Sequence, residues 1–259
     1  MESLKNRQTD NSVLNKEDLV FELKNLGIKS GMNLFVDFLD FSFERIIGGR
    51  NGIIDALYQC VGSEGTLLFV DIDKDNVEPL LSQTEYNETD CDKIRANTYN
   101  YYHNETYSYL KSKYNDNVSF FRHSYYNFVA LGKFACLLTN SQVIDYPLGT
   151  NSPLGRLFEI HGSVLMVGRN LQTSCTTKFL LNKLKPLSTI INGGHFEVDG
   201  VYTWKQFFDY HYPELEENAL LEYVFNRENS LKRGIGEVNC LLFPFYQLVE
   251  DVKKSFNYK

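Results

Sequence analysis

Two carboxylates and one histidine are the side chains of this sequence best suited to moving a proton. Asp37 and Asp40 lie at the end of an apolar run, 33–38, that predicts a β-strand, and sites in α/β sheets commonly form at strand ends. His123 carries an imidazole, which titrates near neutral pH and can act as a general base. Either carboxylate could orient His123 or bind the ammonium group of an amine. The alternatives are an ordinary cap or solvated role for each carboxylate, and for His123 a role in ordering a loop.

A glycine-containing loop precedes the next predicted helix. Gly48, Gly49 and Arg50 stand directly before the helical pattern of 53–61, which a second glycine turn joins to a predicted strand at 66–70. Unpaired amides at a helix N-terminus favour anions, so this loop is a candidate phosphate contact. The succession of strand, glycine loop, helix and strand indicates an α/β fold.

The remaining predicted elements fit one α/β domain over residues 1–259. Asn15 caps a first predicted helix at 15–25, which Gly27 ends. Further along the chain, the patterns predict strands at 128–132 and 163–168, a helix at 176–185, a turn at Gly193-Gly194, a hairpin at 196–203 around Asp199-Gly200, and helical segments from Trp204 and over 242–256.

Residues 71–117 differ from their surroundings because they are polar and rich in tyrosine. Tyr101 and Tyr102 lie in this stretch, which we interpret as an inserted lobe on the substrate side of the domain. Aromatic faces of this kind can stack on a nucleobase or a sugar ring. Packing against the outside of the core is the alternative for these tyrosines.

Charge and composition exclude several classes of protein. The net charge is −7 and the basic residues are scattered, which argues against nucleic acid as a partner. No apolar run approaches the roughly 20 residues that span a bilayer, and residues 1–16 are polar where a signal peptide is apolar, so we expect a cytoplasmic protein without a membrane partner. The five cysteines lie far apart without a Cys-x-x-Cys pair, so we expect small core residues and no metal.

Several blocks of the sequence resemble the aminoglycoside (antibiotic) N-acetyltransferase family, and they occur in the family's order. The opening, 19–70, contains Gly48-Gly49 and the succession Val61-Gly62-Ser63-Glu64-Gly65. The later blocks are Arg122-His123-Ser124 with Val129-Ala130-Leu131-Gly132, Gly149 to Leu157 with Ser152-Pro153, and Arg233-Gly234-Ile235-Gly236 before a helix. The resemblance spans nearly the whole chain. It implies a single α/β domain with a central mixed sheet flanked by helices, acyl-CoA as co-substrate and a small-molecule amine as acceptor.

The resemblance also assigns residues to the co-substrate and the acceptor. It places a first group in contact with acyl-CoA: Phe38, Leu39, Gly48, Gly49, Arg50, Ser124, Ser152, Thr176 and Thr177. The candidate contacts to the acceptor are a second group, which the resemblance and the residue types together indicate: Arg122, Lys178, His195, Tyr101 and Tyr102. For Ser152, Thr176 and Thr177 helix capping is an equal alternative, and His195 is also compatible with a simple turn position.

The departures from the family pattern fall on positions that carry its chemistry. The family's His-x-x-Glu, whose histidine acts as general base, aligns with Lys178 and Leu181, and its His-x-Ser-Leu aligns with the segment from Asp37 to Asp40. His123 is then the best remaining base, supported by Asp37 and Asp40. A general base typically contributes about a hundredfold to ten-thousandfold in rate, so loss of the usual histidine is compatible with catalysis by positioning.

Three functions remain open on this basis. The tyrosines, together with Arg95, Arg122 and Arg169, favour N-acylation of a nucleotide-linked amino sugar used for surface polysaccharide. An aminoglycoside acceptor is the second reading, and it would be expected to need dense carboxylates around a polycation. A catalytically silent binding protein that keeps the scaffold is the third. A homodimer is compatible with all three.

Overall fold

The computed structural model describes most of the chain. The described residues are 13–38, 43–73, 78–81, 85–96, 104–140, 143–168, 174–184, 186–212, 231–235 and 238–255. Four predicted site residues lie outside them, namely Leu39, Asp40, Tyr101 and Tyr102, and so does Arg169.

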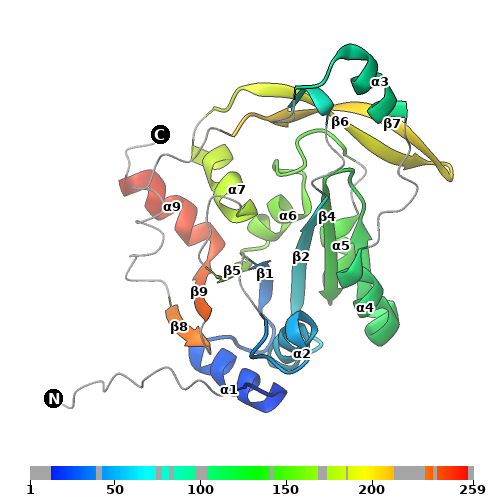
Figure 1. Ribbon diagram of the computed structural model, residues 1–259. Coiled ribbons are helices and arrows are strands. Elements are labelled where there is room, and N and C mark those ends of the chain that lie inside the picture. The colour runs from blue at the N-terminus through cyan, green and yellow to red at the C-terminus, as the bar shows by residue number, and fades with distance from the viewer. Residues whose placement is uncertain are drawn as a thin grey trace.

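A seven-stranded mixed sheet forms the centre of the molecule (Figure 1). Its strands, in spatial order, are β3 (Val118–Phe121), β4 (Tyr126–Gly132), β2 (Thr66–Ile72), β1 (Asn33–Phe38), β5 (Ser163–Val167), β9 (Val238–Pro244) and β8 (Leu231–Ile235). β1 pairs in parallel with β2 and β5, while β4 and β9 are antiparallel to their neighbours. The carboxyl ends of β1, β2 and β5 therefore share one edge of the sheet.

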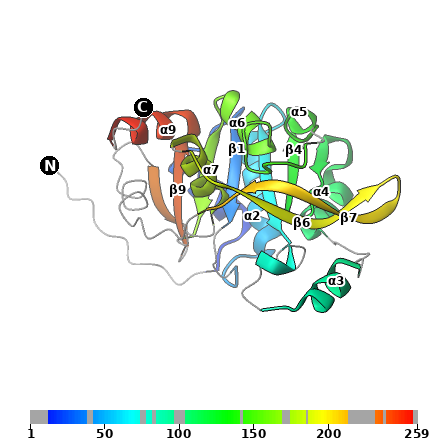
Figure 2. The same ribbon diagram turned by 90° about the horizontal axis from the view of Figure 1, so that it is seen from above.

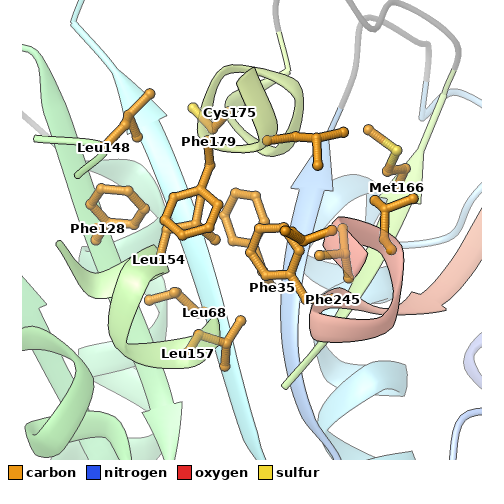
Figure 3. Packing of buried hydrophobic residues seen from close by; sticks show 14 of the residues in the cluster. Phe35, Leu68, Phe128, Leu148, Leu154, Leu157, Met166, Cys175, Phe179 and Phe245 are labelled. Atoms are coloured by element: carbon orange, nitrogen blue, oxygen red, sulfur yellow. The ribbon is translucent and has the colours of Figure 1, made fainter. Parts of the chain in front are cut away.

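Helices cover both faces of the sheet, because each central strand is apolar on both sides. One face packs against four helices: α5 (Ala135–Thr139), α6 (Pro153–Glu159), α7 (Cys175–Leu184) and α9 (Phe245–Ser255). Figure 3 shows this core, with Phe179 of α7 and Phe245 of α9 beside Phe35 of β1. The other face packs against α1 (Lys16–Leu26), α2 (Gly49–Val61) and α4 (Glu105–Tyr114). Alternation along β1 decides which side chain meets which layer.

A long two-stranded hairpin lies over the carboxyl edge of the central sheet (Figures 1 and 2). Its strands are β6 (Thr189–Val198) and β7 (Val201–Tyr210), joined by Asp199 and Gly200, which both have positive φ. The short elements η1 (Pro79–Leu81) and α3 (Glu88–Ala96) lie beside it, and η2 (Asn115–Asn117) follows α4.

The predicted α/β class with a mixed central sheet flanked by helices is confirmed. The Asn15 cap is present, since its side chain accepts a hydrogen bond from the Asp18 amide at 3.0 Å, and Gly27 ends α1 in the left-handed region. The Asp199-Gly200 hairpin is also confirmed.

Three local predictions are wrong. The segment from Trp204 is strand β7, because its backbone pairs along its whole length with β6. Gly193-Gly194 forms no turn and lies inside β6, where the Trp204 ring occupies the space of a Gly193 side chain. The stretch 242–244 is the end of β9, and the helix begins only at Phe245.

The tyrosine-rich segment is partly built into the core. Leu110 of α4 is fully buried, and Tyr107, Tyr109 and Tyr114 pack against the core beside it. Asp55 of α2 accepts hydrogen bonds from the hydroxyls of Tyr109 and Tyr114, both at 2.8 Å, and forms an ion pair with Lys113. These contacts fasten α4 to α2.

Within the described part of the chain, no helix is long and apolar enough to cross a membrane, and no group of three or more candidate side chains is placed to hold a metal ion. All five cysteines are described and unpaired, and Cys60, Cys91, Cys175 and Cys240 are buried.

Candidate active site

The candidate site lies where β1, β2 and β5 end and where α7 begins, beneath the hairpin β6–β7 (Figure 1). The amino end of β4 reaches the same edge, because Tyr126 pairs with Ile72 at the end of β2. This is the edge at which open α/β sheets commonly bind ligands.

Asp37 connects strand β1 to the first turn of α7. Its position two residues after Phe35 places its carboxylate on the α7 face of the sheet. One carboxylate oxygen accepts hydrogen bonds from the Ser174 hydroxyl, the Thr176 amide at 3.1 Å and the Thr176 hydroxyl at 2.8 Å. Burial raises the pKa of Asp37, while these hydrogen bonds and Lys178 oppose the rise. Asp37 therefore fixes the start of the helix.

Lys178 ends the first turn of α7, at the position where the family histidine was expected. Its Nζ donates to the Tyr126 hydroxyl at 3.2 Å and lies over the rings of Tyr126 and Tyr212 at 5.6 and 5.5 Å. The other expected family position, Leu181, is 1% exposed and packs in the apolar core. A cation and a leucine thus stand where the resemblance predicted an imidazole and a carboxylate.

Asp209 near the end of β7 is a site residue that the sequence interpretation missed. Its side chain is 4% exposed, and it accepts a hydrogen bond from the Tyr210 amide at 2.8 Å and another from Asn192. Burial raises the pKa of Asp209 to about 6, against the lowering effect of these hydrogen bonds and of Lys178. The signal that could have found it is the alternation of β7, which buries Phe207 and Asp209 on one side.

His123 has both ring nitrogens engaged. Nε2 donates to the Ile144 carbonyl at 3.0 Å, so Nδ1 is the acceptor for the amides of Tyr125 and Tyr126 at 3.1 and 3.3 Å. The ring is 2% exposed, and burial lowers its pKa to about 4. The rings of Phe196 and Phe207 from the hairpin contact it edge-on. Within the described residues no hydrogen bond or ion pair joins His123 to Asp37.

The neighbours of His123 in sequence have different environments. Arg122 forms an ion pair with Glu197 and donates to the Tyr202 hydroxyl at 3.1 Å. Ser124 is 3% exposed, and its Oγ has no hydrogen-bond partner among the described residues. The buried Tyr212 hydroxyl likewise has none there. These two oxygens can bond an additional polar group.

Phe38 and the loop before α2 form a second part of the site. Gly48 and Gly49 have positive φ, and no side chain caps α2. Arg50 donates to the Asp71 carboxylate at 2.7 Å and lies over the Phe38 ring at 5.0 Å. Its Nε is buried without a hydrogen-bond partner among the described residues. A helix start with an adjacent guanidinium fits an anionic group.

The other predicted contacts are built into secondary structure. Ser152 caps α6, because its Oγ accepts from the Gly155 amide at 3.0 Å and donates to the Gly149 carbonyl at 2.7 Å. Thr176 bonds Asp37, and Thr177 donates its amide to Ser174 at 3.2 Å. His195 lies within β6, where Nε2 donates to the Arg95 carbonyl at 3.0 Å and the ring packs edge-on against Trp204.

Comparison with known proteins places this arrangement in a family. The family model described as aminoglycoside 3-N-acetyltransferase matches residues 41–257. A curated relative from Bacillus subtilis (strain 168), the SPbeta prophage-derived aminoglycoside N(3')-acetyltransferase-like protein YokD, is 31% identical over 93% of this chain and 92% of its own length.

The chain belongs to the aminoglycoside 3-N-acetyltransferase family.

Other relatives of the family agree with this membership. Aminoglycoside N(3)-acetyltransferase III from Pseudomonas aeruginosa is 28% identical over 60% of this chain and 59% of its own length. The crystal structure of YokD superposes with a TM-score of 0.76 at 25% identity and covers 93% of this chain and 98% of its own. The AAC-IIIb structure, a binary complex with CoASH, has a TM-score of 0.71 at 20% identity, covers 93% of this chain and 97% of its own, and therefore supports the fold.

Membership of this family makes the chain an acyltransferase. Of the two positions at which the sequence was expected to depart from the family pattern, Lys178 donates to Tyr126 and Leu181 is part of the core. Asp37 of β1 supplies a buried carboxylate at the start of α7, and Asp209 of the hairpin supplies a second buried carboxylate.

Proposed function

We propose that this chain transfers an acyl group from an acyl-CoA to the amine of an amino sugar. The observation that carries the proposal is made at the carboxyl edge of the sheet, where the Lys178 ammonium lies over the Tyr212 ring at 5.5 Å and acts electrostatically on Asp209, which is buried near the end of β7. Acyl transfer to an amine needs a proton acceptor and donors for developing negative charge. These side chains include both kinds of group.

The loop at the start of α2 is the proposed contact for the anionic part of acyl-CoA. The uncapped helix start favours an anion, and Arg50, which is paired with Asp71, can donate a further hydrogen bond through its buried Nε. The Phe38 ring under the guanidinium holds this side chain in place. Ser124, whose Oγ is buried and unpaired within the described residues, is the further proposed contact. Acyl-CoA supplies the activated thioester carbonyl.

The acceptor we favour is an amino sugar without a phosphate group. The nucleotide-linked amino sugar expected from the sequence drew on Arg95, Arg122 and Arg169. Arg95 forms an ion pair with Glu78 and Arg122 with Glu197, and Arg169 lies outside the described residues. Buried carboxylates at Asp37 and Asp209 instead match a cationic acceptor. A solved structure of the same fold, AAC-VIa, is bound to sisomicin, which is therefore included among the amines to be tested.

Release of free CoA tests the proposed reaction. The purified chain is mixed with acetyl-CoA or butyryl-CoA and with sisomicin, glucosamine or a nucleotide-linked amino sugar, and thiol is measured over time. We expect release with at least one amine without phosphate. Release only with the nucleotide-linked sugar would restore the acceptor expected from the sequence. Absence of release across the panel would contradict acyl transfer and favour a silent binding protein.

Calorimetry tests the proposed acyl-CoA contact separately. Binding of CoA to the unaltered chain is compared with binding to Arg50→Gln and to Lys29→Gln, a control at the opposite edge of the sheet. We expect about a tenfold weaker Kd for Arg50→Gln, since a hydrogen bond to a charged group contributes about 1.5 kcal/mol or more. Unchanged affinity would remove Arg50 from the site. Light scattering on the same samples measures whether the chain forms the homodimer that the sequence leaves open.

A further inference from the structure

Asp209 and Lys178 approach the candidate site from two separate elements. Asp209 comes from β7 of the hairpin, above the sheet edge, and Lys178 comes from the first turn of α7 below it (Figure 1). Lys178 shares α7 with the predicted contacts Thr176 and Thr177, whereas Asp209 lies on a hairpin strand for which the sequence predicted no site residue. The hairpin therefore covers the candidate site and also contributes the Asp209 carboxylate to it.

The surroundings of Asp209 identify it as a carboxylate held in an unusual environment. Lys178 is the cation that acts on it. The other ionisable groups that interact with it come from α7, from β4 and the residue before it, and from the end of β7 and the segment after it: Cys175, Tyr125, Tyr126, Tyr210 and Tyr212. Burial raises the pKa of each of these four tyrosines and of Cys175. Asp209 is therefore the acid in this group that changes charge closest to neutral pH.

The two other candidate bases, Asp37 and His123, already use most of their acceptor atoms in hydrogen bonds. One oxygen of Asp37 already accepts three hydrogen bonds at the start of α7. His123 uses both ring nitrogens for backbone partners. Asp209 accepts hydrogen bonds from the Tyr210 amide and from Asn192. Because a carboxylate has about four lone pairs, it can still accept a proton or a further hydrogen bond.

We propose that Asp209 accepts the proton that the acceptor ammonium must lose, and that Lys178, held between Tyr126 and Tyr212, is the positioning residue that keeps this carboxylate charged. This inference rests on the proposed acyl transfer. It assigns to Asp209 the general-base role that the histidine has in the family. The buried Tyr212 hydroxyl, unpaired among the described residues, is the adjacent group that can hold the acceptor.

The proposed step balances in protons and electrons. The acceptor R–NH3⁺ gives one proton to the Asp209 carboxylate and becomes R–NH2, whose lone pair attacks the thioester carbonyl carbon. The new C–N bond forms and the carbonyl π electrons move to oxygen. As the oxyanion collapses, the C–S bond breaks, and the sulfur leaves with its electron pair and takes the second nitrogen proton. The products are the amide and CoASH, and Asp209 returns its proton to solvent.

The pH dependence of kcat/KM tests the proposal with four variants. The chain is assayed between pH 5 and 9 with acetyl-CoA and whichever amine of the panel it acylates fastest. The variants are Asp209→Asn, Asp209→Glu, Lys178→Met and Asp199→Asn, the last an exposed control at the tip of the same hairpin. Thermal melts check that each variant folds.

The expected results follow from the roles assigned. For the unaltered chain kcat/KM falls with acid below about pH 6. Asp209→Asn lowers kcat about a hundredfold or more, and Asp209→Glu restores part of the loss. Lys178→Met moves the acid limb to higher pH, because an attraction that favours the charged carboxylate is removed. Asp199→Asn matches the unaltered chain.

Other results would overturn the inference. An active Asp209→Asn variant with the same pH profile would show that Asp209 takes no proton, while acyl transfer itself would stand. If Asp209→Asn fails to fold, an unmoved acid limb in Lys178→Met leads to the same conclusion. A chain that acylates no amine at any pH would instead overturn the proposed function, and the inference with it.

Discussion

The Asp37 carboxylate receives both the amide and the hydroxyl of Thr176, so that the end of β1 and the start of α7 form one unit. The Ser174 hydroxyl donates to the same oxygen and also accepts the Thr177 amide. Through this arrangement Asp37 acts as a cap supplied from a strand. Because Lys178 follows in the same turn of α7, the contact also helps to set where its ammonium group lies.

Removing this contact should destabilise the fold. We expect Asp37→Ala to lower the free energy of unfolding by about 2–4 kcal/mol, since it leaves buried donors unpaired at a helix start. Thr176→Val keeps the shape but loses one donor, and should cost about 1 kcal/mol. Urea unfolding measures both, with the exposed Thr203→Val as control. Costs that simply add in the double variant would contradict a direct coupling between the two residues.

The environment of His123 predicts a pH dependence of stability. Its pKa is lowered to about 4 in the fold, so the unfolded chain binds the proton first as the pH falls. The stability that it contributes is complete above about pH 6.5 and is lost as the pH falls through 4, by up to about 3 kcal/mol. Unfolding measured between pH 7.5 and 4 should therefore show a shallower loss for His123→Gln. The exposed His211→Gln is the control, and equal slopes in all three proteins would refute the assignment.

Much of the fold could be predicted because the necessary signals are local. Asn15 and Gly27 bracket α1 with side-chain and backbone preferences that act within a few residues. Asp199-Gly200 supplies the positive φ values of a hairpin turn. The strands β1, β2 and β5 are apolar on both faces, which predicts burial between two layers.

The site could be predicted only in part because its contacts are distant in sequence. Lys178 reaches Tyr126, 52 residues earlier, and no local pattern records such a meeting. In β7 the spacing of Trp204, Phe207 and Phe208 imitates a helical face, whereas pairing with β6 decides the strand. That error concealed Asp209, since only the alternation of a strand shows that it faces inward with Phe207.

Gly193 should be intolerant of any side chain. A Cβ there would lie 2.5 Å from a carbon of the Trp204 ring and 3.0 Å from the Glu78 carboxylate. We expect Gly193→Ala to cost about 1–3 kcal/mol, the usual range for overpacking. Gly200→Asn at the tip of the same hairpin is the control, because asparagine tolerates a positive φ and nothing lies within 4 Å. Equal stability of the two variants in urea would show that Trp204 can move away from β6.

Asp209 should reduce stability at the pH where it serves catalysis. Its folded pKa, about 6, is raised above the ordinary value of 3.8, so its contribution to stability is complete below 3.8 and is lost as the pH rises through 6. The shift corresponds to about 3 kcal/mol above that pH. Asp209→Asn should therefore gain stability relative to the unaltered chain as the pH rises from 4 to 8, while kcat falls. Thermal melts across this range measure the gain, with Asp199→Asn as the matched control. A constant difference in Tm between pH 4 and 8 would show that folding does not raise the pKa of Asp209, which would contradict the environment assigned to it.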